Sequence, residues 1–238
     1  MVAALAATES MTPAEYELVS QLPLFCSLAP EELAALAERF HRRSYRRGEI
    51  IYHHDDLAGS LFLLTKGRIK VRLLSPSGTK EVTYGWATPG TILGATNLIG
   101  EGSQQSDTVA VENCDVLVLG RDDFRAFLRQ HPEATEVLLE LMASRFRRAI
   151  SRFYDLAFLD APARLAKVLV QLAENGEIQD DGSIVLASIT QRELASLIGT
   201  TRESTNKWLH FFVRQGCIEF NRGTLRIRRI DSLRKRAS

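Results

Sequence analysis

The spacing of hydrophobic residues changes along the chain, which predicts helices first, then strands, then helices again. Within 13–40 the apolar positions recur at helical intervals, as Leu33 and Leu36 illustrate. Between 45 and 119 they alternate or form short runs, and glycines interrupt them as they do in turns. Many short strands separated by turns favour a sandwich or barrel.

The longest uninterrupted helical pattern runs from 132 to about 160 and would span roughly 40 Å at about 1.5 Å per residue. Its apolar positions alternate at spacings of three and four, the a/d seam of a coiled coil; they are Leu139, Met142, Phe146, Ala149, Phe153 and Leu156. The chain has no second heptad stretch to cover this seam. We therefore predict a homodimer with twofold symmetry, the alternative being that the seam packs on the protein's own strands.

After a break at Asp160 and Pro162, the segment 190–212 predicts a helix-turn-helix. Thr190 and Glu193 form a capping box, and Gly199 supplies a left-handed turn between two short helices. The apolar positions expected to be buried are Leu194, Leu197 and Ile198 in the first helix and Thr205, Leu209 and Phe212 in the second. A plain helical hairpin that docks a protein is the alternative to a DNA-reading motif.

Polar side chains gather at the start of the second helix. Arg and Lys donate to guanine, Glu accepts from cytosine, and Ser, Thr and Asn contact bases or phosphates. The exposed positions are Thr201, Arg202, Glu203, Ser204, Asn206 and Lys207. Beyond the helix, 217–220 and 224–227 predict a small hairpin with its turn at 221–223, which would form a wing.

The charge distribution points to the same end of the chain. The formal net charge is only +1, but residues 202–238 hold ten Lys and Arg against three acids, a local balance of +7. A polyanion such as duplex DNA would suit this segment, whereas a solvated basic surface is the alternative interpretation.

Several function classes are not indicated. Cys26, Cys114 and Cys217 are widely spaced, so we expect neither a disulfide framework nor a metal site. The five histidines are scattered and no catalytic motif occurs, so we expect no catalytic residues and no enzyme activity. No apolar run approaches a membrane span and the first residues lack a basic signal region, so we expect a cytoplasmic protein without a membrane partner.

Several motifs give the chain a clear resemblance to the CRP/FNR family of bacterial transcription regulators. They are the β-roll pattern at 48–51, 61–64, 67 and 90–94, the hinge LAFLD at 156–160, and the recognition helix TREST at 201–205. The resemblance implies an α+β fold with three parts: a cyclic-nucleotide-binding-like antiparallel β-roll at 14–130, a dimerisation helix at 131–159 and a winged helix-turn-helix at 160–238.

The resemblance also implies roles for residues. The base readers fall on Arg202, Glu203 and Lys207, and the operator would be a palindrome of TGTGA-like half-sites. Further DNA contacts are expected from Thr190, Gln191, Thr201, Ser204, Asn206 and Arg222. Family analogy alone suggests that the loop 174–183 touches RNA polymerase.

The sensor half departs from the family pattern. Cyclic-nucleotide binders of the family use a Glu for the ribose and an Arg for the phosphate, and these positions are Ala95 and Gln105 here. Losing the charge-assisted pair costs on the order of 1.5–3 kcal/mol. Cyclic AMP in the usual pose is therefore not expected. If an effector pocket is used, its residues would be Gly94, Ala95, Thr96, Gln105, Ser106, Ala149 and Ile150.

Other sensor chemistries stay open to different degrees. Only Cys26 lies in the first hundred residues, which excludes the family's iron–sulfur branch. Haem would need an axial ligand such as His53 or His54, although an adjacent pair beside aspartates is typical of solvated surface. A thiol switch at Cys114, a non-standard pocket for an unidentified small effector, and a pocket that binds nothing are the remaining alternatives.

Overall fold

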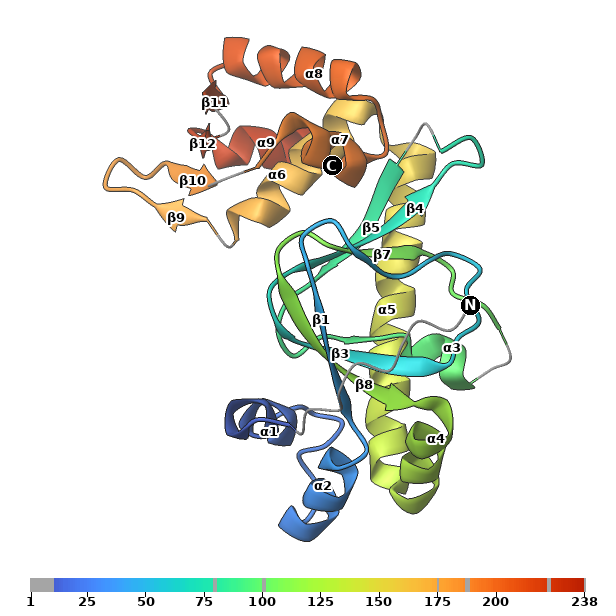
Figure 1. Cartoon of the computed structure of the whole chain (residues 1–238). Helices are drawn as coiled ribbons and strands as arrows, with labels where there is room; N and C mark the ends of the chain where they lie inside the picture. Colours follow the sequence, from blue (N-terminus) through green and yellow to red (C-terminus); the bar gives the residue numbers. More distant parts are fainter. Residues whose placement is uncertain are drawn as a thin grey trace. The chain divides into compact units, whose positions relative to one another are not determined.

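The computed structural model describes residues 11–78, 81–99, 102–174, 176–186, 189–221 and 224–237. The chain divides into two compact units (Figure 1). The first comprises Met1–Leu73 and Tyr84–Phe146, and the second comprises Leu74–Thr83 and Arg147–Ser238.

The first helix begins where the sequence supplies a cap. Thr12 accepts a hydrogen bond from the Glu15 N–H while the Glu15 carboxylate accepts one from the Thr12 N–H, and Pro13 occupies the first turn. The helices are α1 (Pro13–Ser20), α2 (Pro30–Ala37), α3 (Ala95–Ile99), α4 (Arg121–Gln130) and the first part of α5 (Pro132–Phe158).

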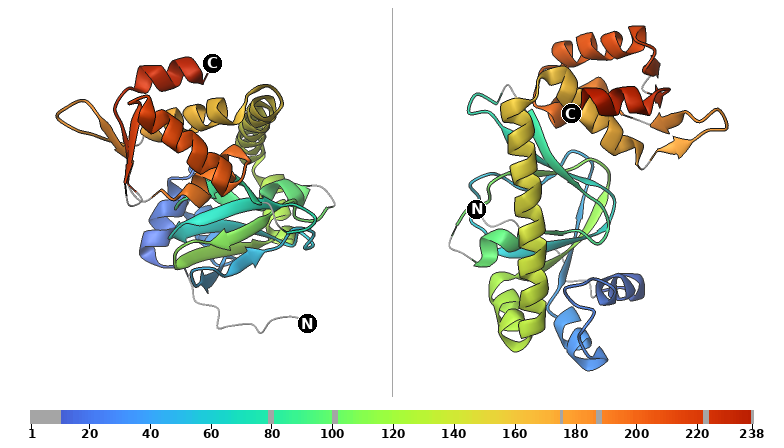
Figure 2. Two further views of the ribbon diagram at one scale, coloured as in Figure 1. Left: turned by 90° about the horizontal axis from the view of Figure 1, so that it is seen from above. Right: turned by 180° about the vertical axis from the view of Figure 1, so that it is seen from behind.

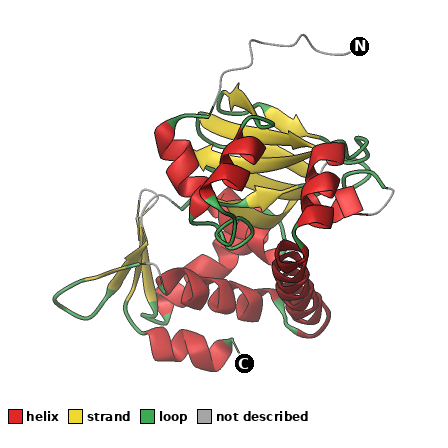
Figure 3. Ribbon diagram, turned by 90° about the horizontal axis from the view of Figure 1, so that it is seen from below, coloured by secondary structure: helices red, strands yellow, loops and turns green. Residues whose placement is uncertain are grey.

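Eight strands of this region form two four-stranded sheets, in the orders β1-β8-β3-β6 and β2-β7-β4-β5. Their bounds are β1 (His41–Tyr45), β2 (Ile50–Tyr52), β3 (Ser60–Lys66), β4 (Ile69–Leu74), β5 (Glu81–Ala87), β6 (Ile92–Leu93), β7 (Asp107–Ala110) and β8 (Cys114–Gly120). Strand β8 lies antiparallel between β1 and β3, and β7 lies antiparallel between β2 and β4. Figure 3 shows these strands in yellow. The antiparallel β-roll expected from the sequence is confirmed.

Strand β3 contributes side chains to two apolar clusters. Successive side chains of a strand point to opposite faces, and both faces of β3 are buried. Phe62 and Leu64 belong to a cluster that both sheets share, whereas Leu61 and Leu63 pack with α1, α2, α4 and the start of α5. This strand is therefore continuously apolar rather than alternating.

Helix α5 is long and mostly uncovered. It spans 27 residues, but only Ala134 and Leu138 are fully buried. It ends at Phe158, after which Asp160 caps the next helix by accepting a hydrogen bond from the Ala163 N–H at 2.9 Å. The sequence placed this break correctly.

The second unit is a helical domain with a small sheet (Figure 2). It contains α6 (Ala161–Ala173), β9 (Glu177–Ile178), β10 (Ile184–Leu186), α7 (Gln191–Ile198), α8 (Arg202–Arg214), β11 (Ile218–Asn221), β12 (Thr224–Ile227) and α9 (Ile230–Arg236). The sheet order is β11-β12-β10-β9. The sequence indicated the hairpin of β11 and β12, but it did not show that this hairpin is extended by β10 and β9.

A pair of buried hydroxyls joins two segments of the second unit. Thr83 Oγ1 and Ser196 Oγ lie 2.7 Å apart, and Thr83 is fully buried. Arg152 Nη1 donates to the Thr83 carbonyl at 2.8 Å. Because a buried hydroxyl without a partner is costly, this hydrogen bond holds the end of 74–83 against α7.

No helix in the described part of the chain is both long enough and apolar enough to cross a membrane.

Candidate nucleic-acid interface

The turn between α7 and α8 has the geometry that its glycine predicts. Gly199 has φ +65°, and its N–H donates to the Ala195 carbonyl. A Cβ at this position would also approach Leu156 Cδ2 to 3.1 Å. Glycine therefore permits both the left-handed backbone and the close packing on α5.

The caps and the buried face of the two helices agree with the sequence, with one correction. Thr190 and Glu193 form the capping box of α7, and Thr201 caps α8 by accepting from the Ser204 N–H at 3.1 Å. Leu197, expected in the buried face of α7, is only half-buried. Ala195 and Ser196 are buried in addition to Leu194 and Ile198, because α7 is covered on a second side by the segment that carries Thr83. The buried residues of α8 are Thr205, Leu209 and Phe212, as expected.

This packing leaves three side chains exposed on one side of α8. Arg202 and Glu203 occupy the first turn and Lys207 follows one turn later, and all three are exposed. Residues four apart on a helix are neighbours on its surface. Lys207 Nζ also lies 5.2 Å from the centre of the Trp208 ring, which steadies its ammonium beside the helix.

Two further residues of the expected DNA-contacting set bond to each other. Gln191 Nε2 donates to Asn206 Oδ1 at 2.8 Å, which ties the first residue of α7 to α8. Both side chains are half-exposed. Arg222, the expected wing contact, lies outside the described residues together with the centre of its turn.

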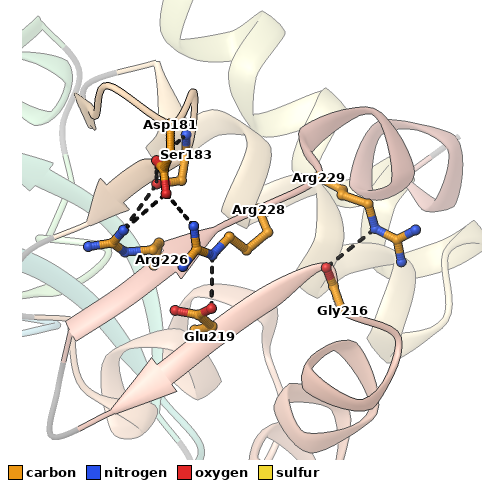
Figure 4. Close-up of polar contacts among 7 residues, drawn as sticks. All are labelled: Asp181, Ser183, Gly216, Glu219, Arg226, Arg228 and Arg229. Atoms are coloured by element: carbon orange, nitrogen blue, oxygen red, sulfur yellow. Dashed lines mark hydrogen bonds and ion pairs between the residues drawn. The ribbon is translucent and has the colours of Figure 1, made fainter.

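The arginines near the wing are largely occupied by internal partners (Figure 4). Arg226 Nη1 lies 3.5 Å from Asp181 Oδ2, and Arg228 pairs with both Asp181 and Glu219, the latter at 2.8 Å. Arg229 donates to the Gly216 carbonyl at 3.3 Å. The balance of +7 in 202–238 therefore overstates the free positive charge, because Asp181 lies outside that window.

The titration of these groups reflects the pairing. Hydrogen bonds from the Ser183 hydroxyl and N–H, aided by Arg228, lower the pKa of Asp181 to about 2. Glu219, followed by Asp181, raises the pKa of Arg228. Both groups hold their charges throughout the physiological pH range.

The cassette comprises the expected effector residues Gly94, Ala95, Thr96, Gln105 and Ser106, which lie at the start of α3 and just before β7. Gly94 has φ +80°, and a Cβ on it would lie 2.8 Å from the Ser60 carbonyl oxygen. Ala95 begins α3 and is fully buried, whereas Thr96 and Gln105 are exposed and Ser106 is half-buried. Gln105 Nε2 donates to the Ser103 carbonyl at 3.2 Å, so its amide has an internal acceptor.

Two polar groups close to this cassette were not anticipated. Tyr52 is buried, and its burial raises the pKa of the phenol. Asp107, beside Ser106, is buried and accepts from the His54 N–H at 2.9 Å and from Arg72 Nε at 3.4 Å. The sequence signal that could have revealed the buried carboxylate is the presence of Asp107 in a short strand whose other residues are Thr, Val and Ala.

The remaining pocket residues and the seam lie on α5. Ala149 and Met142 are half-buried, and Met142 packs on the core of the first unit. The exposed seam residues are Leu139 at 61%, Phe146 at 66%, Phe153 at 72% and Leu156 at 51%, and Ile150 is exposed at 52%.

The histidines weighed as haem ligands lie on the surface. His54 Nδ1 is 3.0 Å from Asp55 Oδ2, and His53 Nδ1 is 3.7 Å from Asp107 Oδ1, with both rings more than half exposed. Over the residues that the structure describes, no group of three or more His, Cys, Asp or Glu side chains could hold a metal ion.

Comparison with known proteins matches both units. The family model of the cyclic nucleotide-binding domain matches residues 42–131, and that of the Crp-like helix-turn-helix domain matches residues 163–236. The cyclic AMP receptor protein of Thermus thermophilus is 34% identical over 206 residues, covering 87% of this chain and 92% of the relative. The CRP-like cAMP-activated global transcriptional regulator of Mycobacterium tuberculosis is 28% identical over 228 residues, covering 93% and 99%.

Solved structures give the same result. The catabolite activator protein of Thermus thermophilus is 32% identical with a TM-score of 0.52, covering 90% of this chain and 98% of that one. A CooA mutant from Carboxydothermus hydrogenoformans, at 23% identity, shares the fold with a TM-score of 0.76 over 94% of this chain and 99% of that one. The chain therefore belongs to the CRP/FNR family of transcription regulators, which bind DNA through a helix-turn-helix and are not enzymes.

Proposed function

We propose that this protein is a homodimeric regulator that reads a palindromic operator of TGTGA-like half-sites. The observation that carries the proposal is the exposure of Arg202, Glu203 and Lys207 on one side of α8, while Thr205, Leu209 and Phe212 anchor the opposite side. A helix fixed in this way can enter the major groove with its reading residues outward.

The chemistry of the three side chains supports base reading. Arg202 and Lys207 can donate to guanine O6 and N7, and Glu203 can accept from cytosine N4. Thr201 and Thr190 use their hydroxyls as helix caps, so their part in DNA binding would be to orient the first turns of α8 and α7 toward phosphates.

The exposed seam supports dimerisation. Leu139, Phe146, Phe153 and Leu156 recur at heptad spacing and are each at least half exposed. Pairing α5 with its copy would cover them and would present two reading helices to half-sites about 34 Å apart. Contact of the 174–183 loop with RNA polymerase would follow from the family's mode of action.

We further propose that operator binding does not require cyclic AMP. The relatives from Thermus thermophilus and Mycobacterium tuberculosis are both named for cyclic AMP. In this chain Ala95 is buried in the apolar core and Gln105 carries no charge. A cyclic phosphate bound there would lose its usual cationic partner.

Selection of bound sequences from random duplex DNA by the purified protein, without additive, tests these proposals together. We expect a twofold-symmetric consensus and an affinity that cyclic AMP leaves unchanged. An asymmetric consensus would contradict the dimeric arrangement. A consensus that emerges only with cyclic AMP would contradict our interpretation of the cassette, and one that emerges only with haem or a thiol reductant would identify a different sensor chemistry.

A further inference from the structure

The hydrogen bond between Gln191 and Asn206 restricts what Asn206 can offer to DNA. Gln191 is the first residue of α7, and Asn206 lies one turn beyond Arg202 on α8. The Gln191 Nε2 to Asn206 Oδ1 distance of 2.8 Å is that of a well-formed bond. Both side chains are half-exposed, and Asn206 directly precedes the exposed Lys207 on α8.

A side-chain amide has one carbonyl acceptor and one NH2 group with two donors. Reading adenine with two hydrogen bonds requires both groups of an asparagine, because adenine presents an N6 donor beside an N7 acceptor. The Oδ1 atom of Asn206 is held by Gln191, so the group of this amide that stays unengaged in the pair is its NH2 group.

We propose that Gln191 is a positioning residue that makes Asn206 a donor-only reader of one base. This inference rests on the proposed DNA-reading function. A donor favours guanine and thymine, whose polar groove-edge groups are acceptors only, over adenine, which presents the N7 acceptor beside an N6 donor. Cytosine, whose groove edge carries the N4 donor, is disfavoured most. Because Asn206 and Arg202 are neighbours on the helix surface, this base adjoins the one that Arg202 reads.

Replacing the partner should reverse the preference. In Gln191→Glu a carboxylate stands where the donor was, and it can only accept. The Asn206 amide must then turn its NH2 group toward residue 191 and its carbonyl toward the groove. The variant should favour bases with an exocyclic amine, cytosine or adenine. A glutamate in the first turn of α7 suits the positive end of the helix, so the variant should fold.

The measurement is fluorescence anisotropy on operators that carry each of the four base pairs at the position next to that of Arg202. Each affinity is divided by the same protein's affinity for random duplex, which removes the general effect of the added negative charge. We expect wild type to prefer guanine or thymine over cytosine by about two- to tenfold, the worth of one hydrogen bond. Asn206→Ala should abolish the preference, and Gln191→Glu should invert it.

Gln215→Glu is the matched control, since it adds the same charge to an exposed glutamine at the far end of α8. It should keep the wild-type preference. An unchanged preference in Asn206→Ala or in Gln191→Glu, or a wild-type preference for cytosine, would overturn the inference. Arg202→Ala distinguishes failure of the reading function from failure of the amide-pair inference. If Arg202→Ala leaves the preference at its own base pair unchanged, the proposed reading function fails. If it relaxes that preference, an unchanged preference in the Gln191 or Asn206 variants refutes only the role of the amide pair.

Discussion

Removing one side chain from the seam of α5 gives a quantitative test of dimerisation. A phenylalanine side chain has about 200 Å² of apolar surface, so the 72% exposure of Phe153 leaves about 140 Å² open to a partner. If pairing buries half of that exposed area on each of the two protomers, about 140 Å² of Phe153 surface is buried per dimer. This burial is worth about 3.5 kcal/mol at about 25 cal/mol per Å². Phe153→Ala should therefore weaken the dimer about 300-fold, at about 1.4 kcal/mol per factor of ten.

Sedimentation equilibrium of the full chain over a range of concentrations gives the dimer Kd. Phe158→Ala is a matched control, because Phe158 is also 72% exposed on the same helix but lies off the heptad positions. It should leave the Kd within a few-fold of wild type. Equal weakening by the two variants, or a Phe153→Ala dimer as tight as wild type, would refute the reasoning that the seam pairs with its copy.

Three further outcomes are expected. Arg202→Ala should relax sequence preference at one base pair by about 1–3 kcal/mol, seen as one degenerate position in selected sequences; an equal loss on random duplex would argue against base reading. In a double-mutant cycle by urea denaturation, Thr83→Val and Ser196→Ala should show a coupling of about 1 kcal/mol, since each hydroxyl is the other's buried partner; strict additivity would mean that the contact does not form. The low pKa of Asp181 implies that its stabilising effect is present above the unfolded pKa of about 4 and is lost as pH falls toward about 2. The difference in unfolding free energy between wild type and Asp181→Asn should thus become smaller as pH falls from about 5 to about 3. A difference in unfolding free energy that stays constant over this pH range would contradict the expectation.

The features that could be predicted from sequence are those with local signals. The capping box of Thr190 and Glu193, the left-handed Gly199 and the break at Asp160 each depend on residues within a few positions of one another. The heptad spacing of α5 likewise lies within a single helix. These signals sufficed for the helix-turn-helix and for the long helix.

The features that escaped prediction depend on contacts between distant residues. Strands β9 and β10 are too short to show a period, and they exist because β10 pairs with β12 about forty residues later. Asp181 meets Arg226 and Arg228 across a similar separation, so the charge count of 202–238 could not include it. The burial of Ser196 requires Thr83, which is 113 residues away in sequence.

The buried position of Ala95 bears on how this sensor could change over evolutionary time. Ala95 has no exposed surface and packs among Leu61, Leu98 and their neighbours. A glutamate introduced there would place a carboxylate in an apolar core, which is strongly destabilising without a paired charge. We therefore expect Ala95→Glu alone to destabilise the fold, unless the surrounding apolar side chains are made smaller at the same time. The burial of position 95 thus limits how an acidic ligand-binding residue could be introduced into this part of the chain, because such a change needs accompanying changes in its neighbours.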